Sequence, residues 1–262
     1  MKRTILKENN LKELLTNDVN YFAIDSSLKE VDIPSNSSIN LLITKPHQEL
    51  TINVKENASL FLSLLVKENI DGGKLNINVS ENAKVEVYFA DFSFGKETYI
   101  FNGQLLGRDS SLNWHLASLT ADNDQKQFDI SVKHLANSTF AKMDNYGVCK
   151  DDGKLVFSGI SHVINGASSS KTHQNAKIMV FDEKSIGIAK PILKIDENDV
   201  EASHAAVVGK INDEHLFYLT SRGLSESAAK ELITLGYLKP ILNGFMEEEI
   251  KEEIMSLIER RM

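Results

Sequence analysis

The sequence predicts a mainly β fold: a right-handed parallel β-helix with a short N-terminal helix and C-terminal helices. Three features lead to this prediction. Short segments of alternating apolar and polar residues follow one another along most of the chain, a strand-turn-strand unit repeats, and helical periodicity is confined to the two ends. We therefore expect a helical segment at residues 1–20, a β-helix core at 21–211 and a helical region at 212–262.

A brief helix is predicted near the N-terminus. Leu11, Leu14 and Leu15 form one short apolar stripe between Asn10 and Asn17. Such spacing places the three leucines on one face of a helix, and the flanking asparagines favour its ends.

From about Tyr21 to Ala206 the sequence alternates between apolar and polar residues, as is typical of strands. Asn, Asp, Gly or Ser residues separate the segments, which predicts turns between them. The clearest predicted strands are LTINV, SLFLSLLV, KLNINV, KVEVYFA, LNWHLASL, DISVKHL and KLVFSG.

A weak internal repeat lies within this region. Thr51 to Leu65 (TINVKENASLFLSLL) realigns on Asn76 to Ala90 (NINVSENAKVEVYFA), with Ala58 and Ala83 25 residues apart. Repeats of this kind indicate a solenoid, in which each coil buries its apolar side chains against its neighbours. Small or polar turn residues recur later, at intervals that drift and then shorten, near Ser110, Asn137, Gly153, Ala167, Ser185 and Asp199.

An antiparallel β-sandwich is the alternative, because it also has short strands joined by regular turns. The repeated unit and the presence of only four prolines favour the β-helix.

After Asn212 the period becomes helical. Ser225 is a candidate N-cap followed by Glu226, and Gly236 is a candidate C-cap. The apolar stripe of this helix comprises Ala228, Ala229, Leu232 and Ile233. A second helix is predicted within Phe245 to Met262, with its apolar face formed by Ile250, Ile254, Leu257 and Ile258. These helices could cap the solenoid or present a surface to a partner.

Composition excludes several classes of function. The net charge of -8 and a pI near 5.4 argue against a surface for nucleic acid or an anionic membrane. No apolar run approaches the roughly 20 residues that span a bilayer, and the N-terminus has no apolar signal-peptide core. One cysteine forms no internal disulfide. We expect a cytoplasmic protein.

Motifs for known chemistry are weak. Residues 165–172 (NGASSSKT) lack the glycine spacing of a phosphate-binding loop, so a polar turn is expected there. The single cysteine, Cys149, is expected to be buried and structural. No two of the seven histidines have metal-ligand spacing. Of these, His204 is distinctive, because it lies among Ala202, Ser203, Ala205 and Ala206 and nothing large shields its ring.

The run from Val200 to Leu238 carries a more specific signal. Its sequence, VEASHAAVVGKINDEHLFYLTSRGLSESAAKELITLGYL, resembles the C-terminal signature of the SufB/SufD family, the β-helix scaffold proteins of the Suf iron-sulfur cluster assembly system. The resemblance is specific over about residues 155 to 240 and looser elsewhere. The matching elements are Ser203-His204, Ala205 to Gly209, Asp213-Glu214, Leu216-Phe217-Tyr218, Ser221-Arg222-Gly223 and Ala228 to Leu232.

The resemblance implies a non-enzymatic scaffold subunit. Such a subunit would pair with a SufB-like paralogue through its last coils, or with a second copy of itself, and would dock a SufC-like ABC ATPase through its C-terminal helices. It implies no stably bound cofactor in this chain alone, and a transient iron or iron-sulfur cluster shared with the partner, for which His204 is the candidate metal ligand. The implied partner-binding residues are Leu216, Phe217, Tyr218, Arg222, Gly223 and Leu232.

The SufD-like branch is favoured over the SufB-like branch. SufB-like chains resemble each other in a cysteine-containing segment near the penultimate coils, whereas HQNAKIMVFDEKSIGIAK in this chain contains none. This chain departs from the SufD-like pattern at Ala202, where a cysteine is common, and at Ala205, where a glycine is common.

A β-helix protein that cleaves or binds carbohydrate is the alternative function. Clustered aspartates on strands would mark such a protein, and Asp144, Asp151 and Asp152 form the one such group near the predicted strands.

Overall fold

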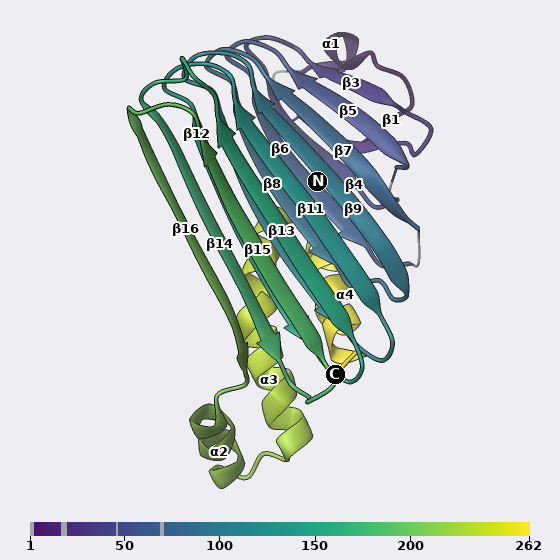
Figure 1. The fold of residues 1–262 in the computed structure, drawn as a ribbon. Coiled ribbons are helices and arrows are strands. Elements are labelled where there is room, and N and C mark those ends of the chain that lie inside the picture. The colour runs from purple at the N-terminus through teal and green to yellow at the C-terminus, as the bar shows by residue number, and fades with distance from the viewer. Residues whose placement is uncertain (1–2, 17–19, 46, 69–70) are drawn as a thin grey trace.

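The computed structural model describes residues 3–16, 20–45, 47–68 and 71–262. Two β-sheets face one another, and after the first two strands, which are neighbours in one sheet, the chain alternates between the sheets at successive strands (Figure 1). All strand pairings are parallel between described residues, which confirms the predicted β-helix and rules out the antiparallel sandwich.

The described residues form a nine-stranded and a seven-stranded sheet. The nine-stranded sheet runs in the order β1 (Thr4–Leu6), β2 (Asn20–Ile24), β4 (Ser38–Ile43), β6 (Ser59–Val66), β8 (Lys84–Asp91), β10 (Ser111–Thr120), β12 (Phe140–Cys149), β14 (Ser170–Val180) and β16 (Val200–Lys210). The seven-stranded sheet runs from β3 (Glu30–Ile33) through β5 (Glu49–Val54), β7 (Gly72–Val79), β9 (Lys96–Leu105), β11 (Gln125–His134) and β13 (Lys154–Val163) to β15 (Ile186–Ile195).

Alternation places one set of side chains of every strand between the two sheets. The resulting core is apolar through most coils, and parallel register stacks equivalent residues of successive coils on one another. One such ladder runs Leu41, Leu62, Val87, Trp114 and Met143, all of them buried. The seven segments predicted as clear strands correspond to β5, β6, β7, β8, β10, β11 and β13.

The repeat has a structural cause at one corner of the coil. Asn57 and Asn82, one repeat apart, both have a left-handed backbone, with φ of 57° and 55°. The following Ala58 and Ala83 are fully buried beneath the turn. Asn tolerates this conformation better than most residues, since its short polar side chain can bond locally. The equivalent corner residues at Asn36, Asp109, Ser138 and Ser169 also have positive φ, and their spacing grows along the chain. The predicted turn intervals shorten because the later turns near Gly153 and Ser185 lie at the opposite corner of the coil.

The N-terminal helix is confirmed but shorter than predicted. Helix α1 spans Leu11–Leu14 and buries Leu11, while Asn17 lies outside the described residues. The strand β1 precedes it within the segment 1–20 and pairs with β2.

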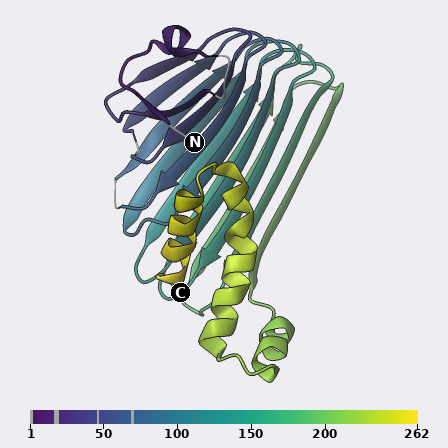
Figure 2. The ribbon, with the colours of Figure 1, turned by 180° about the vertical axis from the view of Figure 1, so that it is seen from behind.

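The C-terminal helices are α2 (Asp213–Ser221), α3 (Glu226–Leu238) and α4 (Glu248–Glu259), with a 3₁₀ segment η1 (Lys239–Gly244) between the last two. Helices α3 and α4 lie along the outer face of the nine-stranded sheet (Figure 2). Their apolar faces and η1 form a second core with that sheet, which includes Leu238, Ile241, Ile254, Ile258 and Phe92. The helices therefore cover a flank of the β-helix and do not cap its end.

Two local predictions for these helices have different outcomes. Ser225 caps α3 as predicted, because its hydroxyl accepts a hydrogen bond from the Ala228 amide at 3.2 Å. The prediction that Gly236 ends this helix is wrong. The helix continues two residues further, which carries Leu238 into the second core, where it is 1% exposed. Burial of this leucine outweighs the modest cost of glycine within the helix.

No helix in the described parts of the chain is long and apolar enough to span a membrane.

We predict that the corner residue Asn82 matters for its backbone conformation. Asn82→Ala should lower the free energy of unfolding by about 1 kcal/mol, because alanine is disfavoured at positive φ. Asn82→Gly should change it by less than about 0.5 kcal/mol, since glycine adopts this conformation freely. Urea unfolding of both variants checks this, and equal losses would show that the asparagine side chain is what stabilises the corner.

Candidate functional site

The C-terminal end of the β-helix is open. Strands β15 and β16 are the last of their sheets, and each pairs with a neighbour on one side only within the described residues. Their outer edges carry backbone N–H and C=O groups in the arrangement that accepts a further strand. We call the exposed surface of these two strands the open end. It is the edge formed by β16 and β15 in Figure 1.

His204 faces the inside of this end. In parallel register it lies beside Gln174, which lies beside Met143, so it is the last member of the core ladder that begins at Leu41. Side chains in one such ladder share a face of the sheet. Because no further coil covers it, His204 is exposed, and it has no hydrogen bond or ion pair with the rest of the described chain.

The coil below His204 has a polar interior. Gln174 is 5% exposed and donates to the Ser161 hydroxyl and the Ile192 carbonyl, both at 2.9 Å. Thr172 donates to the same hydroxyl at 2.8 Å. A Cβ at Gly159 would lie 2.7 Å from the Gln174 side-chain oxygen, so glycine leaves the room that this glutamine needs. The apolar core is thus replaced by hydrogen-bonding groups as it approaches the open end.

The open end is also apolar around its rim. Five large hydrophobic side chains on β15 and β16 are between 37% and 56% exposed, which is a concentration unusual for a free surface. They are Ile186, Ile192, Ile195, Val207 and Val208. Small residues of β16, including Ala202 and Ala206, lie between them. An exposed strand edge with an apolar rim has the properties of a surface for another protein.

A second exposed surface lies on α2 and α3, and we call it the helical surface. Phe217, Tyr218 and Leu232 are 73%, 56% and 51% exposed. Helix α2 contains no buried residue and lies beyond the end of the sheets (Figure 1). The predicted partner-binding residues thus lie on α2, on α3 or in the turn between them. Leu216 is half-buried and less accessible than Phe217 and Tyr218, and Gly223 has no side chain to offer.

Local interactions hold the helical surface in shape. The Asn212 side chain caps α2 by accepting from the Glu214 and His215 amides. Gly223, with φ of 96°, allows the chain to turn towards α3. The guanidinium of Arg222 lies 5.1 Å from the centre of the Tyr218 ring, a cation–π contact that supports this exposed aromatic side chain. No sequence pattern predicted α2 as a separate helix.

The other candidate residues do not join these surfaces. Cys149 is fully buried, as predicted, and burial raises the pKa of its thiol. The polar turn predicted at residues 165–172 is correct only in part: residues 164–169 connect β13 and β14, whereas residues 170–172 begin β14, where Ser170 and Thr172 are buried. Asp144, Asp151 and Asp152 form separate ion pairs with Lys142, Lys150 and Lys184. Among the described residues, no group of three or more His, Cys, Asp or Glu side chains could hold a metal ion.

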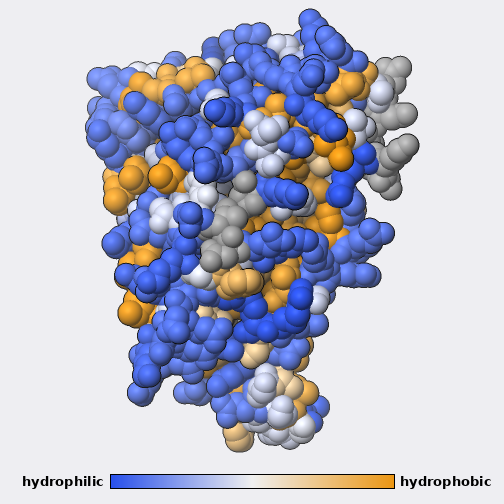
Figure 3. Space-filling model, turned by 90° about the vertical axis from the view of Figure 1, so that its right-hand side faces the viewer, coloured by the Kyte–Doolittle hydropathy of each residue, from blue (hydrophilic) through white to orange (hydrophobic). Residues whose placement is uncertain are grey.

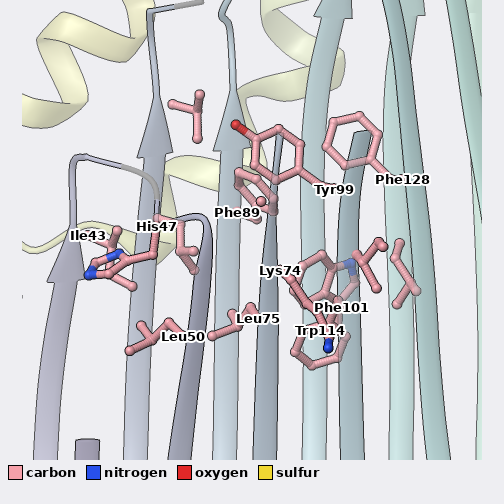
Figure 4. A pocket seen from close by; sticks show the side chains of 15 residues that line it. Ile43, His47, Leu50, Lys74, Leu75, Phe89, Tyr99, Phe101, Trp114 and Phe128 are labelled. Carbon is pink, nitrogen blue, oxygen red and sulfur yellow. The ribbon is translucent and has the colours of Figure 1, made fainter. Parts of the chain in front are cut away.

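A small apolar cavity of about 40 Å³ lies between the sheets, several coils from the open end (Figure 4). Leu50, Leu75, Phe89 and Phe101 contribute to its lining. The flank shown in Figure 3 is mostly hydrophilic, with hydrophobic side chains visible between hydrophilic ones. The cavity lining also includes His47, Lys74 and Tyr99. The residues that the family resemblance singles out lie instead at the open end and the helical surface, which are therefore the candidate sites.

Comparison with known proteins shows the family to which this chain is related. The family described as SUF system FeS cluster assembly, SufBD core domain, matches residues 44–237. The chain is 32% identical over 212 residues to iron-sulfur cluster assembly protein SufD of Bacillus subtilis (strain 168), which covers 70% of this chain and 48% of that protein. It is 31% identical over 163 residues to iron-sulfur cluster assembly protein SufB of the same organism. That match covers 61% of this chain and 34% of SufB.

A third relative is SufD of Escherichia coli (strain K12), which is 23% identical over 230 residues, covering 77% of this chain and 54% of that protein. The chain therefore spans about half the length of the curated SufD proteins that it matches.

Thiol reactivity tests whether the open end is accessible. In an Ala206→Cys variant, the new thiol on β16 should react with a chromogenic disulfide reagent at least about tenfold faster than Cys149, which is buried and has a raised pKa. The parent chain, with Cys149 alone, is the control. Slow reaction of the new thiol at every protein concentration would contradict an exposed open end.

Proposed function

The chain belongs to the SufB/SufD family of the SUF iron-sulfur cluster assembly system and is SufD-like, and from this we propose that it is a non-catalytic scaffold subunit of the assembly complex. It pairs through its open end with a SufB-like subunit, or with a second copy of itself where that subunit is absent. Through its helical surface it docks a SufC-like ABC ATPase. The exposed, inward-facing His204 at an unpaired strand edge is the observation that carries the proposal.

Pairing follows from the physics of the open end. A partner that adds strands to β15 and β16 satisfies their free backbone groups, and it buries the apolar rim formed by residues such as Ile192 and Val207. The partner also extends the core ladder beyond His204, which places this imidazole inside the joined β-helices.

His204 can then contribute one ligand to iron or to an iron-sulfur cluster that is being assembled. Neutral imidazole binds iron, whereas a cluster usually requires four ligands that are mostly thiolates. This chain offers no accessible cysteine, because Cys149 is buried. The remaining ligands must come from the partner or from the cargo itself, so the cluster is shared and transient.

The helical surface supplies the second contact. Aromatic residues with large exposed areas are frequent energetic anchors in protein interfaces, and Phe217 and Tyr218 are two such residues on consecutive positions of α2. Since α2 contains no buried residue, it can engage an ATPase subunit without disturbing the core. A carbohydrate-binding role has no comparable support, because the aspartates that suggested it are separated into ion pairs.

We predict that His204→Ala preserves the complex and lowers its iron content. The complex should form because the substitution leaves the strand edges intact, whereas iron and sulfide should fall to a minor fraction of the parent value. Co-expression with SufB-like and SufC-like subunits, followed by iron and sulfide analysis, checks this. His173→Ala is the matched control, because that histidine lies one coil earlier on the outward side of β14. Equal iron and sulfide content in the parent and both variant complexes would show that His204 is not a ligand.

We predict that Phe217→Asp weakens ATPase binding by at least about 30-fold, as expected for loss of an aromatic anchor worth about 2 kcal/mol. Isothermal titration with the ATPase subunit measures the change. Ile100→Asp, on the far sheet and 40% exposed, is the control and should have no effect. Truncation at Leu224 is a poorer test, because it would uncover the second core. Unchanged affinity of the Phe217 variant would exclude this surface.

A further inference from the structure

A buried cluster of charged and hydroxyl groups lies inside the corner between β8 and β9. Asp91, Ser93, Glu97 and Lys126 are all 4% exposed or less, although no known chemistry of the chain requires them there. The Lys126 ammonium donates to the Asp91 carboxylate at 2.9 Å and to the Ser93 carbonyl at 2.8 Å. The Ser118 hydroxyl donates to the same carboxylate at 3.1 Å.

Two short contacts to one hydroxyl group indicate that a carboxyl group in this cluster is protonated. The Ser93 hydroxyl oxygen lies 2.5 Å from Asp91 Oδ1 and 2.5 Å from Glu97 Oε1. A hydroxyl has one hydrogen and donates to one acceptor. The second short contact is therefore a donation to Ser93 from a protonated carboxyl group.

Glu97 is the group that carries this proton. Burial, together with the neighbouring Asp91 carboxylate, raises the pKa of Glu97 to about 8. Burial acts to raise the pKa of Asp91 as well, but Lys126 and Ser93 outweigh it and lower that pKa. At neutral pH these groups thus form a chain of hydrogen bonds, in which the neutral carboxyl group of Glu97 donates to the Ser93 hydroxyl and this hydroxyl donates to the ionised Asp91.

The same serine holds the end of the C-terminal helix. Arg261, directly after α4, donates to the carbonyl groups of Ser93 and Phe92 and pairs with the Asp124 carboxylate. Asp124 is itself held by the amide groups of Gly95 and Ala121. The Ser93 carbonyl therefore accepts from the internal lysine and from the external arginine at once.

We propose that the proton on Glu97 positions the C-terminal helices: while Glu97 is neutral, Ser93 holds Arg261 and α4 against the β-helix, and loss of this proton loosens that contact. Glu97 is a positioning residue for the helical surface, because α4 and α3 belong to one packed unit. The docking consequence rests on the proposed function, whereas the loosening of α4 does not.

Two effects of ionising Glu97 oppose each other. The Ser93 hydroxyl would lie 2.5 Å from two carboxylates and could donate to only one of them, so Ser93 must move away and take its carbonyl group with it. The new negative charge would also attract Arg261. Lys126 reduces that attraction, since its ammonium lies 3.5 Å from Glu97 Oε1 and between the two carboxylates. The displacement of Ser93 therefore outweighs this attraction, and ionisation of Glu97 loosens the contact between Ser93 and Arg261.

Several charged or titratable groups surround Glu97. They are Asp91 from β8, Lys126 from β11 and the Tyr99 hydroxyl from its own strand, with the Asp124–Arg261 pair beyond Ser93. Asp71, Lys96 and Lys154 line a surface pocket together with Glu97 and Lys126. Burial raises the pKa of the Tyr99 hydroxyl well above its ordinary value, so this group stays neutral while Glu97 titrates.

The same shift predicts how stability depends on pH. The carboxyl group of Glu97 has its pKa raised from 4.5 to about 8 by folding. Its contribution to stability is therefore fully present below pH 4.5, and is lost progressively as the pH rises to about 8. Glu97→Gln keeps the group neutral and should remove this part of the decline.

Hydrogen exchange of the full chain tests the proposal without any partner. In the parent, protection of the segment from Ile254 to Met262, corrected for intrinsic rates, should fall by about tenfold between pH 7 and pH 9, where ionised Glu97 exceeds the neutral form about tenfold. In Glu97→Gln, whose amide can still donate to Ser93, protection should stay constant. In Arg261→Met it should be low at both pH values.

Glu86→Gln is the matched control. This carboxyl group lies on β8, the strand that also carries Asp91, but its hydrogen-bond partners are His115 and Asn113 outside the cluster, so the variant should behave as the parent does. Constant or increased protection of the parent at pH 9 would overturn the proposal, as would a pH dependence that survives in Glu97→Gln. The affinity for the ATPase subunit is measured in parallel. If these variants leave that affinity unchanged, the result rejects the effect on docking but not the loosening of α4.

Discussion

Register is the constraint on which the rest of this structure depends. In a parallel β-helix every coil must present the same side to the core, because a slip of one residue would turn a whole strand inside out. The corner residues with positive φ, such as Asn57 and Asn82, set where each strand of the larger sheet begins. With register fixed, side chains separated by a full coil become direct neighbours.

The same constraint explains why the last coil is left exposed. Its inward side chains continue the ladders of the core but have no next coil to pack on. Leu41 and Met143 are buried because coils lie on both sides of them, whereas His204 is exposed because one is missing. A protein built by stacking is incomplete at an uncapped end, and α3 and α4 leave that end uncovered because they occupy the flank.

Local patterns predicted some elements and missed others for identifiable reasons. The Ser225 cap and the Ile250, Ile254 and Ile258 stripe depend on residues within a few turns, so they were visible. The predicted helix end at Gly236 was wrong because burial of Leu238 against a sheet that is distant in sequence stabilises two further helical residues. The cluster around Glu97 could not be foreseen, since its carboxyl and lysine groups come from separate coils and resemble ordinary turn residues.

The sequence by itself determined the parallel β-helix, the positions of its turns and the distinctive character of His204, because alternation, turn chemistry and a specific motif are all local. Only the tertiary structure decided that His204 points inward, that the helices cover the flank and that Arg261 meets Ser93. Each of these depends on contacts between residues far apart in the chain, and stacking in register is what brings them together.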